Sequence, residues 1–124
     1  MPLRWEILHP QKLVHIVAEG PVTLKEMEDH FDAIYIADAM PYAKLFDAAN
    51  AEPIYSDEDV MTMGARLSAY TATVDSGPLA VIGLSDEVEM TFRRFINISP
   101  SKRPAALFKT EAEARAWLAS KAKP

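Results

Sequence analysis

Hydrophobic and polar positions alternate in two short segments at the start of the chain. Arg4–Leu8 alternates polar and apolar residues, which predicts an edge strand. The turn residues His9-Pro10-Gln11 follow it, so the next apolar segment, Leu13–Ala18, is expected to return beside it as a hairpin. Gly20 and Pro21 are expected to end this second strand.

Four later segments repeat their apolar residues at helical spacing, and each therefore predicts a helix with one buried face. The expected inner faces are Leu24, Met27, Phe31, Ile34 and Tyr35 in the first helix; Val60, Met63, Leu67 and Tyr70 in the second, from Asp57 to about Thr73; Val88, Phe92, Phe95 and Ile96 in the third, Asp86–Asn97; and Ala114, Trp117 and Leu118 in the last, Glu111–Ser120.

Three further strands are expected between these helices: Ala43–Ala48, Leu79–Leu84 and Ala105–Phe108. Leu79–Leu84 is apolar at every alternating position, which indicates a central strand covered on both faces. The element order is then β-β-α-β-α-β-α-β-α. It predicts an α/β domain over residues 1–124: one mostly parallel five-stranded sheet, an antiparallel N-terminal edge hairpin and four helices.

Each helix is preceded by a start signal. Thr23, Ser56 and Thr110 each stand three residues before a carboxylate, the spacing of a capping box, and Ser85 stands before two acids. A hydroxyl at such a position accepts a hydrogen bond from a free backbone N–H, and acids in the first turn oppose the positive end of the helix dipole. These signals determine where the helices begin, but they carry no chemistry of their own.

The composition of the chain excludes several classes of site and partner. The chain has 124 residues, a formal net charge of −5 and no cysteine, so disulfides and thiolate metal sites are excluded and nucleic-acid binding is disfavoured. No signal peptide is evident, and the longest apolar run, about six residues, is far below the roughly 20 needed to span a bilayer. We therefore expect a cytoplasmic protein without an integral membrane segment.

Charge is distributed unevenly. The segment 20–60 holds ten acids and two lysines, whereas 92–109 holds five basic residues and no acid. One interpretation is two solvated faces. The other is that Arg93, Arg94, Lys102 and Arg103 form a basic patch for an anionic partner, or for the acidic face of a second copy.

Motifs for catalysis or cofactor binding are not found. His9, His15 and His30 lack metal-ligand spacing, and His30 is expected on the outer side of the first helix. There is no glycine-rich phosphate loop and no nucleophile elbow. We expect no catalytic residue, no metal and no cofactor.

The loop expected after Asp47 is the best candidate binding site by position. Ligands of parallel α/β sheets gather at the carboxyl ends of strands, beside helix N-termini. Asp47, Asn50, Tyr55 and Ser56 are expected there. The alternative is an ordinary connection in which Ser56 only caps the following helix.

The chain resembles the SpoIIAA-like domains, which are related in fold to STAS domains. The resemblance rests on the hairpin of Trp5-Glu-Ile and Leu13-Val-His-Ile, the strand Lys44-Leu-Phe-Asp47, the apolar strand Leu79–Leu84 and the closing segment Phe108–Leu118. In anti-sigma-factor antagonists, a phosphorylated serine follows the strand that matches Lys44–Asp47. Here Ala48 and Ala49 follow, so the resemblance does not carry a phosphorylation site onto this chain.

Three hypotheses follow. The leading one is a non-enzymatic interaction or regulatory domain that binds a protein partner or itself, because a second copy could cover the other face of Leu79–Leu84 in a homodimer. The alternative is a small apolar-ligand or lipid carrier related in fold to CRAL-TRIO domains. Its cavity would be lined by aromatic residues and by Met27, Met40, Met61, Met63 and Met90, which otherwise pack the core. The third is an enzyme that uses Asp47 with one of Asp57–Asp59.

Overall fold

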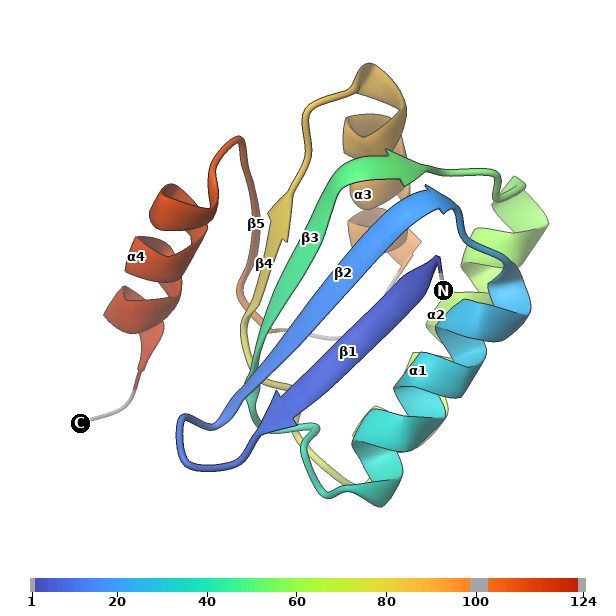
Figure 1. Ribbon diagram of the computed structural model, residues 1–124. Helices are drawn as coiled ribbons and strands as arrows, with labels where there is room; N and C mark the ends of the chain where they lie inside the picture. The colour runs from blue at the N-terminus through green and yellow to red at the C-terminus, as the bar shows by residue number, and fades with distance from the viewer. Residues whose placement is uncertain (1, 99–102, 123–124) are drawn as a thin grey trace.

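The computed structural model describes residues 2–98 and 103–122, and its elements follow the order expected from the sequence (Figure 1). In chain order they are β1 (Leu3–Leu8), β2 (Leu13–Pro21), α1 (Leu24–Ile36), β3 (Ala43–Glu52), α2 (Asp57–Thr71), β4 (Leu79–Ile82), α3 (Asp86–Ile98), β5 (Ala105–Phe108) and α4 (Glu111–Lys121).

One five-stranded sheet has the spatial order β1-β2-β3-β4-β5. β1 and β2 pair antiparallel, and the remaining neighbours pair parallel. The predicted fold class, a mostly parallel sheet with an antiparallel edge hairpin and four helices, is therefore confirmed.

The two central strands β2 and β3 are longer than predicted. β2 continues through Gly20 to Pro21 and β3 continues to Glu52, because the two extensions pair with each other after a register shift between Val17 and Glu19. Gly20 adopts a positive φ of 66°, which glycine tolerates at little cost. Gly20 and Pro21 were expected to end the strand, but they remain in it because they pair with Ala51 and Glu52 of β3.

The helices cover the two faces of the sheet unequally: α1, α2 and α3 lie on one face and α4 lies on the other (Figure 1). On the α4 face, Leu45, Ala80 and Ile82 pack with Ala114 and Leu118. On the opposite face, Leu79 and Val81 pack with Val88 of α3. All four residues of β4 are buried, as predicted for a strand covered on both sides.

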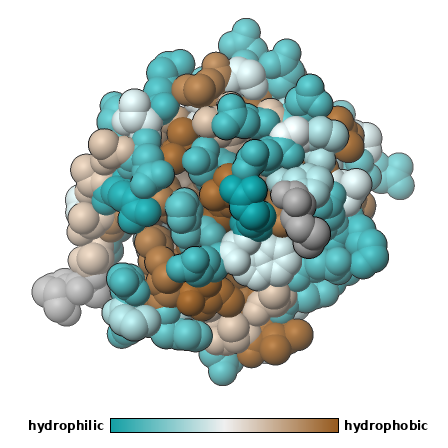
Figure 2. All heavy atoms as spheres, in the orientation of Figure 1, coloured by the Kyte–Doolittle hydropathy of each residue, from teal (hydrophilic) through white to brown (hydrophobic). Residues whose placement is uncertain are grey.

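The cover on the second face of β4 comes from the chain's own α4. The argument that a second copy must cover it is therefore wrong, and a homodimer needs other support. In Figure 2 the side of the molecule seen in Figure 1 is largely hydrophilic, with hydrophobic atoms gathered in its lower left part.

The helix starts form the hydrogen bonds that their sequences predict. Thr23 and Ser56 make complete capping boxes with Glu26 and Asp59. Thr110 Oγ1 accepts from the backbone N–H of Glu113, and Ser85 Oγ accepts from that of Val88. Each bond satisfies a backbone donor that the helix itself leaves free.

Candidate functional site

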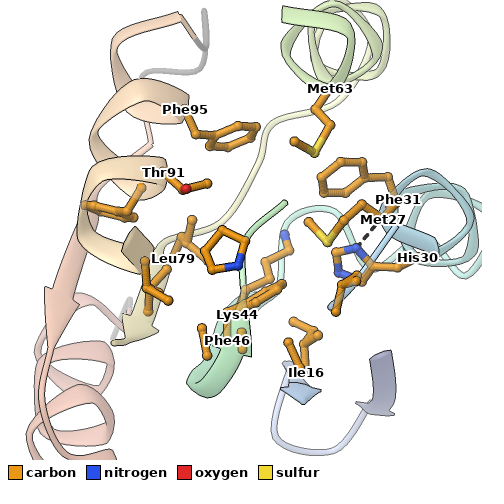
Figure 3. Close-up of a pocket in the computed structure, with 18 of the residues that line it drawn as sticks. Ile16, Met27, His30, Phe31, Lys44, Phe46, Met63, Leu79, Thr91 and Phe95 are labelled. Carbon is orange, nitrogen blue, oxygen red and sulfur yellow. Dashed lines mark hydrogen bonds between the residues drawn. The ribbon is translucent and has the colours of Figure 1, made fainter. Parts of the chain in front are cut away.

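A cavity of about 140 Å³ lies between the sheet and helices α1, α2 and α3 (Figure 3). Its wall is formed by side chains from β2, β3, β4 and the three helices. The apolar part of this wall includes Ile16, Met27, Phe31, Ile34, Phe46, Met63, Leu67, Leu79, Val81, Phe92 and Phe95. The helical face of the fold is thus not completely filled.

The methionines divide between this cavity and the surface. Met27, Met40 and Met63 line the cavity. Met61 and Met90 are 60% and 59% exposed, so the prediction that they share an internal pocket or core is wrong. Their helices turn them outward, because residues 61 and 63, like 88 and 90, stand on opposite sides of a helix. An unbranched thioether adapts to an irregular space, so three methionines make this wall deformable.

Lys44 is the most unusual residue of the cavity. Its side chain rises from β3 into the space below the helices (Figure 3) and is only 4% exposed. Its ammonium group donates a hydrogen bond to the carbonyl oxygen of Met40. Burial, and after it the positive charge of Arg103, lower the pKa of Lys44 from 10.5 to about 7. The cavity therefore holds an amine that titrates near neutral pH.

His30 provides a second buried polar group. It projects from α1 and is 3% exposed, among the rings of Trp5, Phe31 and Phe46. The prediction of an outward-facing histidine is thus wrong, because residues 27, 30, 31 and 34 share one helical face. Burial lowers the pKa of this imidazole from 6.5 to about 4, so it is neutral at pH 7.

The hydrogen bonding of His30 leaves one ring nitrogen without a partner. Nδ1 lies 3.3 Å from the carbonyl oxygen of Met27 (the dashed line in Figure 3). A carbonyl can only accept, so Nδ1 carries the proton and Nε2 is an acceptor. Within the described part of the chain, this buried Nε2 has no hydrogen-bond partner.

Arg103 adds a half-buried cation to the cavity wall. Its guanidinium donates to Ser76 Oγ at 2.8 Å. Burial lowers the pKa of Arg103 to about 10, so it stays charged at neutral pH. Glu52, which is exposed, is the one carboxylate among the described residues of the cavity wall. The buried part of the site, as far as it is described, is thus cationic or neutral.

The four residues predicted as a binding loop do not form one site. Asn50 is exposed within β3 and pairs with Glu19, because β3 extends further than predicted. Asp47 also lies within β3, where it accepts a hydrogen bond from the backbone N–H of Ala49, and strand alternation places it on the α4 face with Leu45. Ser56 caps α2. Only Tyr55 lines the cavity, where burial raises its pKa.

The predicted basic patch is also divided. Arg93 is exposed and pairs with Glu89 on its own helix, whereas Arg94 pairs with Asp57 of α2. Arg103 belongs to the cavity wall, and Lys102 lies outside the described residues. The described arginines therefore face different surroundings and do not form one continuous surface.

Metal and membrane sites can be examined over the same residues. Among residues 2–98 and 103–122, no group of three or more His, Asp or Glu side chains could hold a metal ion. No helix in these ranges is long and apolar enough to cross a membrane.

Sequence reasoning missed Lys44 and His30. The signal for Lys44 was present: in a strand of alternating faces, it shares its side with Phe46 and Ala48, both apolar. A lysine is generally taken to mark the solvent side, because charged side chains are rarely buried without a partner.

Comparison with known proteins concerns the fold. No family model and no curated protein matches this chain. Two solved structures are similar to it over nearly their whole length. An uncharacterised protein of the DUF3478 family with a SpoIIAA-like fold, from Shewanella loihica PV-4, is 18% identical, with a TM-score of 0.63 over 94% of this chain and 93% of that one.

The second structure is the anti-sigma factor antagonist SpoIIAA in its unphosphorylated form. It is 14% identical, with a TM-score of 0.61 over 98% of this chain and 99% of that one. At these identities the likeness shows the architecture, which agrees with the strand order and pairing described above. The chain therefore has a SpoIIAA-like α/β fold.

Proposed function

We propose that this chain is a non-enzymatic interaction or regulatory domain that binds a protein partner across α2 and α3. The observation that carries the proposal is a set of three large apolar side chains held in solvent there. Ile54, Met61 and Met90 are 57%, 60% and 59% exposed. The similarity in fold to an anti-sigma factor antagonist supports the same general role.

Helical spacing and one ion pair relate these side chains. Asp57 and Met61 are one turn apart on α2, and Met90 and Arg94 are one turn apart on α3, so each pair shares a helical face. The ion pair of Asp57 with Arg94 joins the two faces. Ile54 precedes the same helix start. We call Ile54, Met61, Met90 and this ion pair the α2–α3 surface.

Such a composition is typical of a contact surface. Methionine is enriched at protein interfaces, and adjoining exposed apolar groups mark interaction sites in soluble proteins. Charges around an apolar centre add specificity more than affinity. The α2–α3 surface therefore favours a protein partner with an apolar contact of its own.

A photocrosslinking experiment tests the surface. A photoreactive amino acid placed at Met61 or Met90 should give a discrete crosslinked species in cells, whereas one at Ile36 should not. Ile36 is the matched control, because it is 80% exposed but stands at the end of α1. Equal crosslinking from all three positions, or none from any, would contradict the proposal.

The crosslinked mass also tests the homodimer. A product of twice the chain mass of 13.8 kDa would identify a second copy as the partner, and any other discrete mass would identify a different protein. A homodimer through the α2–α3 surface remains a proposal.

A second candidate function, binding of a small apolar ligand, is favoured by the cavity. Dissolved toluene should raise the melting temperature of the protein, because a ligand that binds only the folded state stabilises it. At a concentration ten times its Kd we expect about 1.4 kcal/mol and a shift of several degrees. Calorimetry measures both.

The control for toluene binding is a variant in which a larger side chain fills the cavity. Ala51→Leu should abolish the toluene effect, because Ala51 lines the space. Ala65→Leu, on an exposed position of α2, should leave the effect intact. If toluene stabilises neither the unmodified protein nor Ala65→Leu, this second function is rejected.

A further inference from the structure

The size of the cavity restricts what can occupy it. Its volume is about 140 Å³. An engineered apolar cavity of about 150 Å³ in another protein binds benzene, so an occupant here has one small ring or an equivalent short chain. A long acyl chain would have to extend beyond it. This restriction rests on the second candidate function above and narrows it.

The buried polar groups then restrict the chemistry of the occupant. The Lys44 ammonium group has three N–H donors, and in the described structure the one acceptor that it contacts is the carbonyl oxygen of Met40. That same carbonyl also accepts from the backbone N–H of Gly77 at 2.9 Å. Lys44 therefore still has donors to offer, in surroundings where an unsatisfied donor is costly.

The balance of charge points in the same direction. Among the described residues of the wall, Lys44 and Arg103 are the cations, and the one carboxylate, Glu52, is exposed. His30 is a neutral neighbour whose buried Nε2 is an acceptor without a partner in the described residues. An occupant with an anionic group would give the remaining donors of Lys44 an acceptor, whereas an occupant without polar groups would leave them unmet.

We propose that the cavity binds a small organic acid, in which a single apolar ring or short chain fills the space beside Met27 and Phe31 and the carboxylate receives hydrogen bonds from Lys44. The ligand class is thus a small aromatic or short aliphatic carboxylate. Burial of apolar surface holds the ring or chain, and one charge-assisted hydrogen bond sets the orientation of the ligand.

Three probes of one shape separate the contributions of ring and charge. Toluene, benzoate and benzylamine share a ring and differ in the charge of the substituent. For the unmodified protein, isothermal calorimetry should show benzoate binding about tenfold more tightly than toluene, since one charge-assisted hydrogen bond contributes that much. Benzylamine should bind about tenfold more weakly than toluene, because it brings a like charge to Lys44 and Arg103.

The matched variant is Lys44→Met, which keeps an unbranched side chain and removes the charge. It should lose the advantage of benzoate over toluene while its affinity for toluene changes less than about threefold. Retained toluene binding also shows that the variant has folded around an intact cavity. If benzoate binds this variant as tightly as the unmodified protein, the proposed acid contact is wrong.

Failure of the underlying function would look different. If neither toluene nor benzoate binds the unmodified protein, the cavity is not a ligand site and the second candidate function fails first. If toluene binds and benzoate does not, the cavity is a ligand site but the acid proposal is overturned.

A second measurement needs no substitution. Acetic anhydride modifies neutral amines, and peptide mass analysis reports the reaction at each lysine. Benzoate should slow acetylation of Lys44 about tenfold and leave exposed Lys109 unchanged, because a paired ammonium group loses its proton less readily. Equal rates at Lys44 with and without saturating benzoate would contradict the contact.

Discussion

Replacing Lys44 with methionine is expected to stabilise the empty protein at pH 7 by about 2–4 kcal/mol. Burial holds the pKa of Lys44 at about 7, against 10.5 in the unfolded chain. At neutral pH the folded state must therefore either bury a charge or release a proton that the unfolded state keeps. Chemical denaturation of both proteins measures the difference in their free energy of unfolding.

The pH dependence of stability tests the same prediction independently. Between pH 7 and pH 10 the unfolded chain binds more protons at Lys44 than the folded chain, so stability rises with pH. The unmodified protein should gain about 2 kcal/mol from pH 7 to pH 9, and Lys44→Met should not show this gain. Lys109→Met, at an exposed position, is the control and should keep it.

The opposite outcome is equally specific. If Lys44→Met lowers stability and leaves the pH dependence unchanged, then Lys44 is charged and well satisfied in the empty protein. The cavity would then need no acid to complete it. If the unmodified protein is instead the less stable of the two, the result is consistent with a binding site, where a buried charge is kept for a ligand although it destabilises the empty protein.

Gly77→Ala is expected to destabilise the protein by about 3 kcal/mol, the second large effect. A Cβ atom at residue 77 would overlap the backbone carbonyl oxygens of Pro41 and Tyr42, which cannot rotate away as a side chain could. Relief requires the turn before β4 to move from the segment before β3. Thermal and chemical unfolding would both report the loss.

Gly77→Ala should also disturb the wall of the cavity. The backbone N–H of Gly77 donates to the carbonyl oxygen of Met40, the same atom that accepts from Lys44. Gly20→Ala is the comparison: nothing lies within 4 Å of an added Cβ there, and the positive φ alone should cost about 1 kcal/mol. Equal losses for the two variants would contradict the steric argument at Gly77.

Local rules accounted for the order and the ends of most elements. The hydroxyls of Thr23, Ser56 and Thr110 start three helices through hydrogen bonds that span three residues, so the sequence alone was sufficient to place them. The apolar run similarly predicted a strand buried on both faces over Leu79–Leu84, which the structure shortens to Leu79–Ile82, with Leu84 exposed. Capping and alternation depend on neighbours along the chain, which is why they could be predicted.

The ends of β2 and β3 could not be predicted from neighbouring residues in the chain. Gly20, Pro21 and Asn50 look like loop residues, yet the two strands pair across them after a shift in register. A backbone segment becomes a strand when its N–H and C=O groups find partners, and those partners are about thirty residues away in the chain.

The sequence by itself determined the α/β class, the nine elements and the helix starts. Only the tertiary structure decided that α4 covers the second face of β4, that His30 and Lys44 are buried, and that Met61 and Met90 are not. It also left a cavity between the sheet and three helices. A cavity is the space that side chains from six distant elements fail to fill, so its volume and polar wall depend on how those elements pack together.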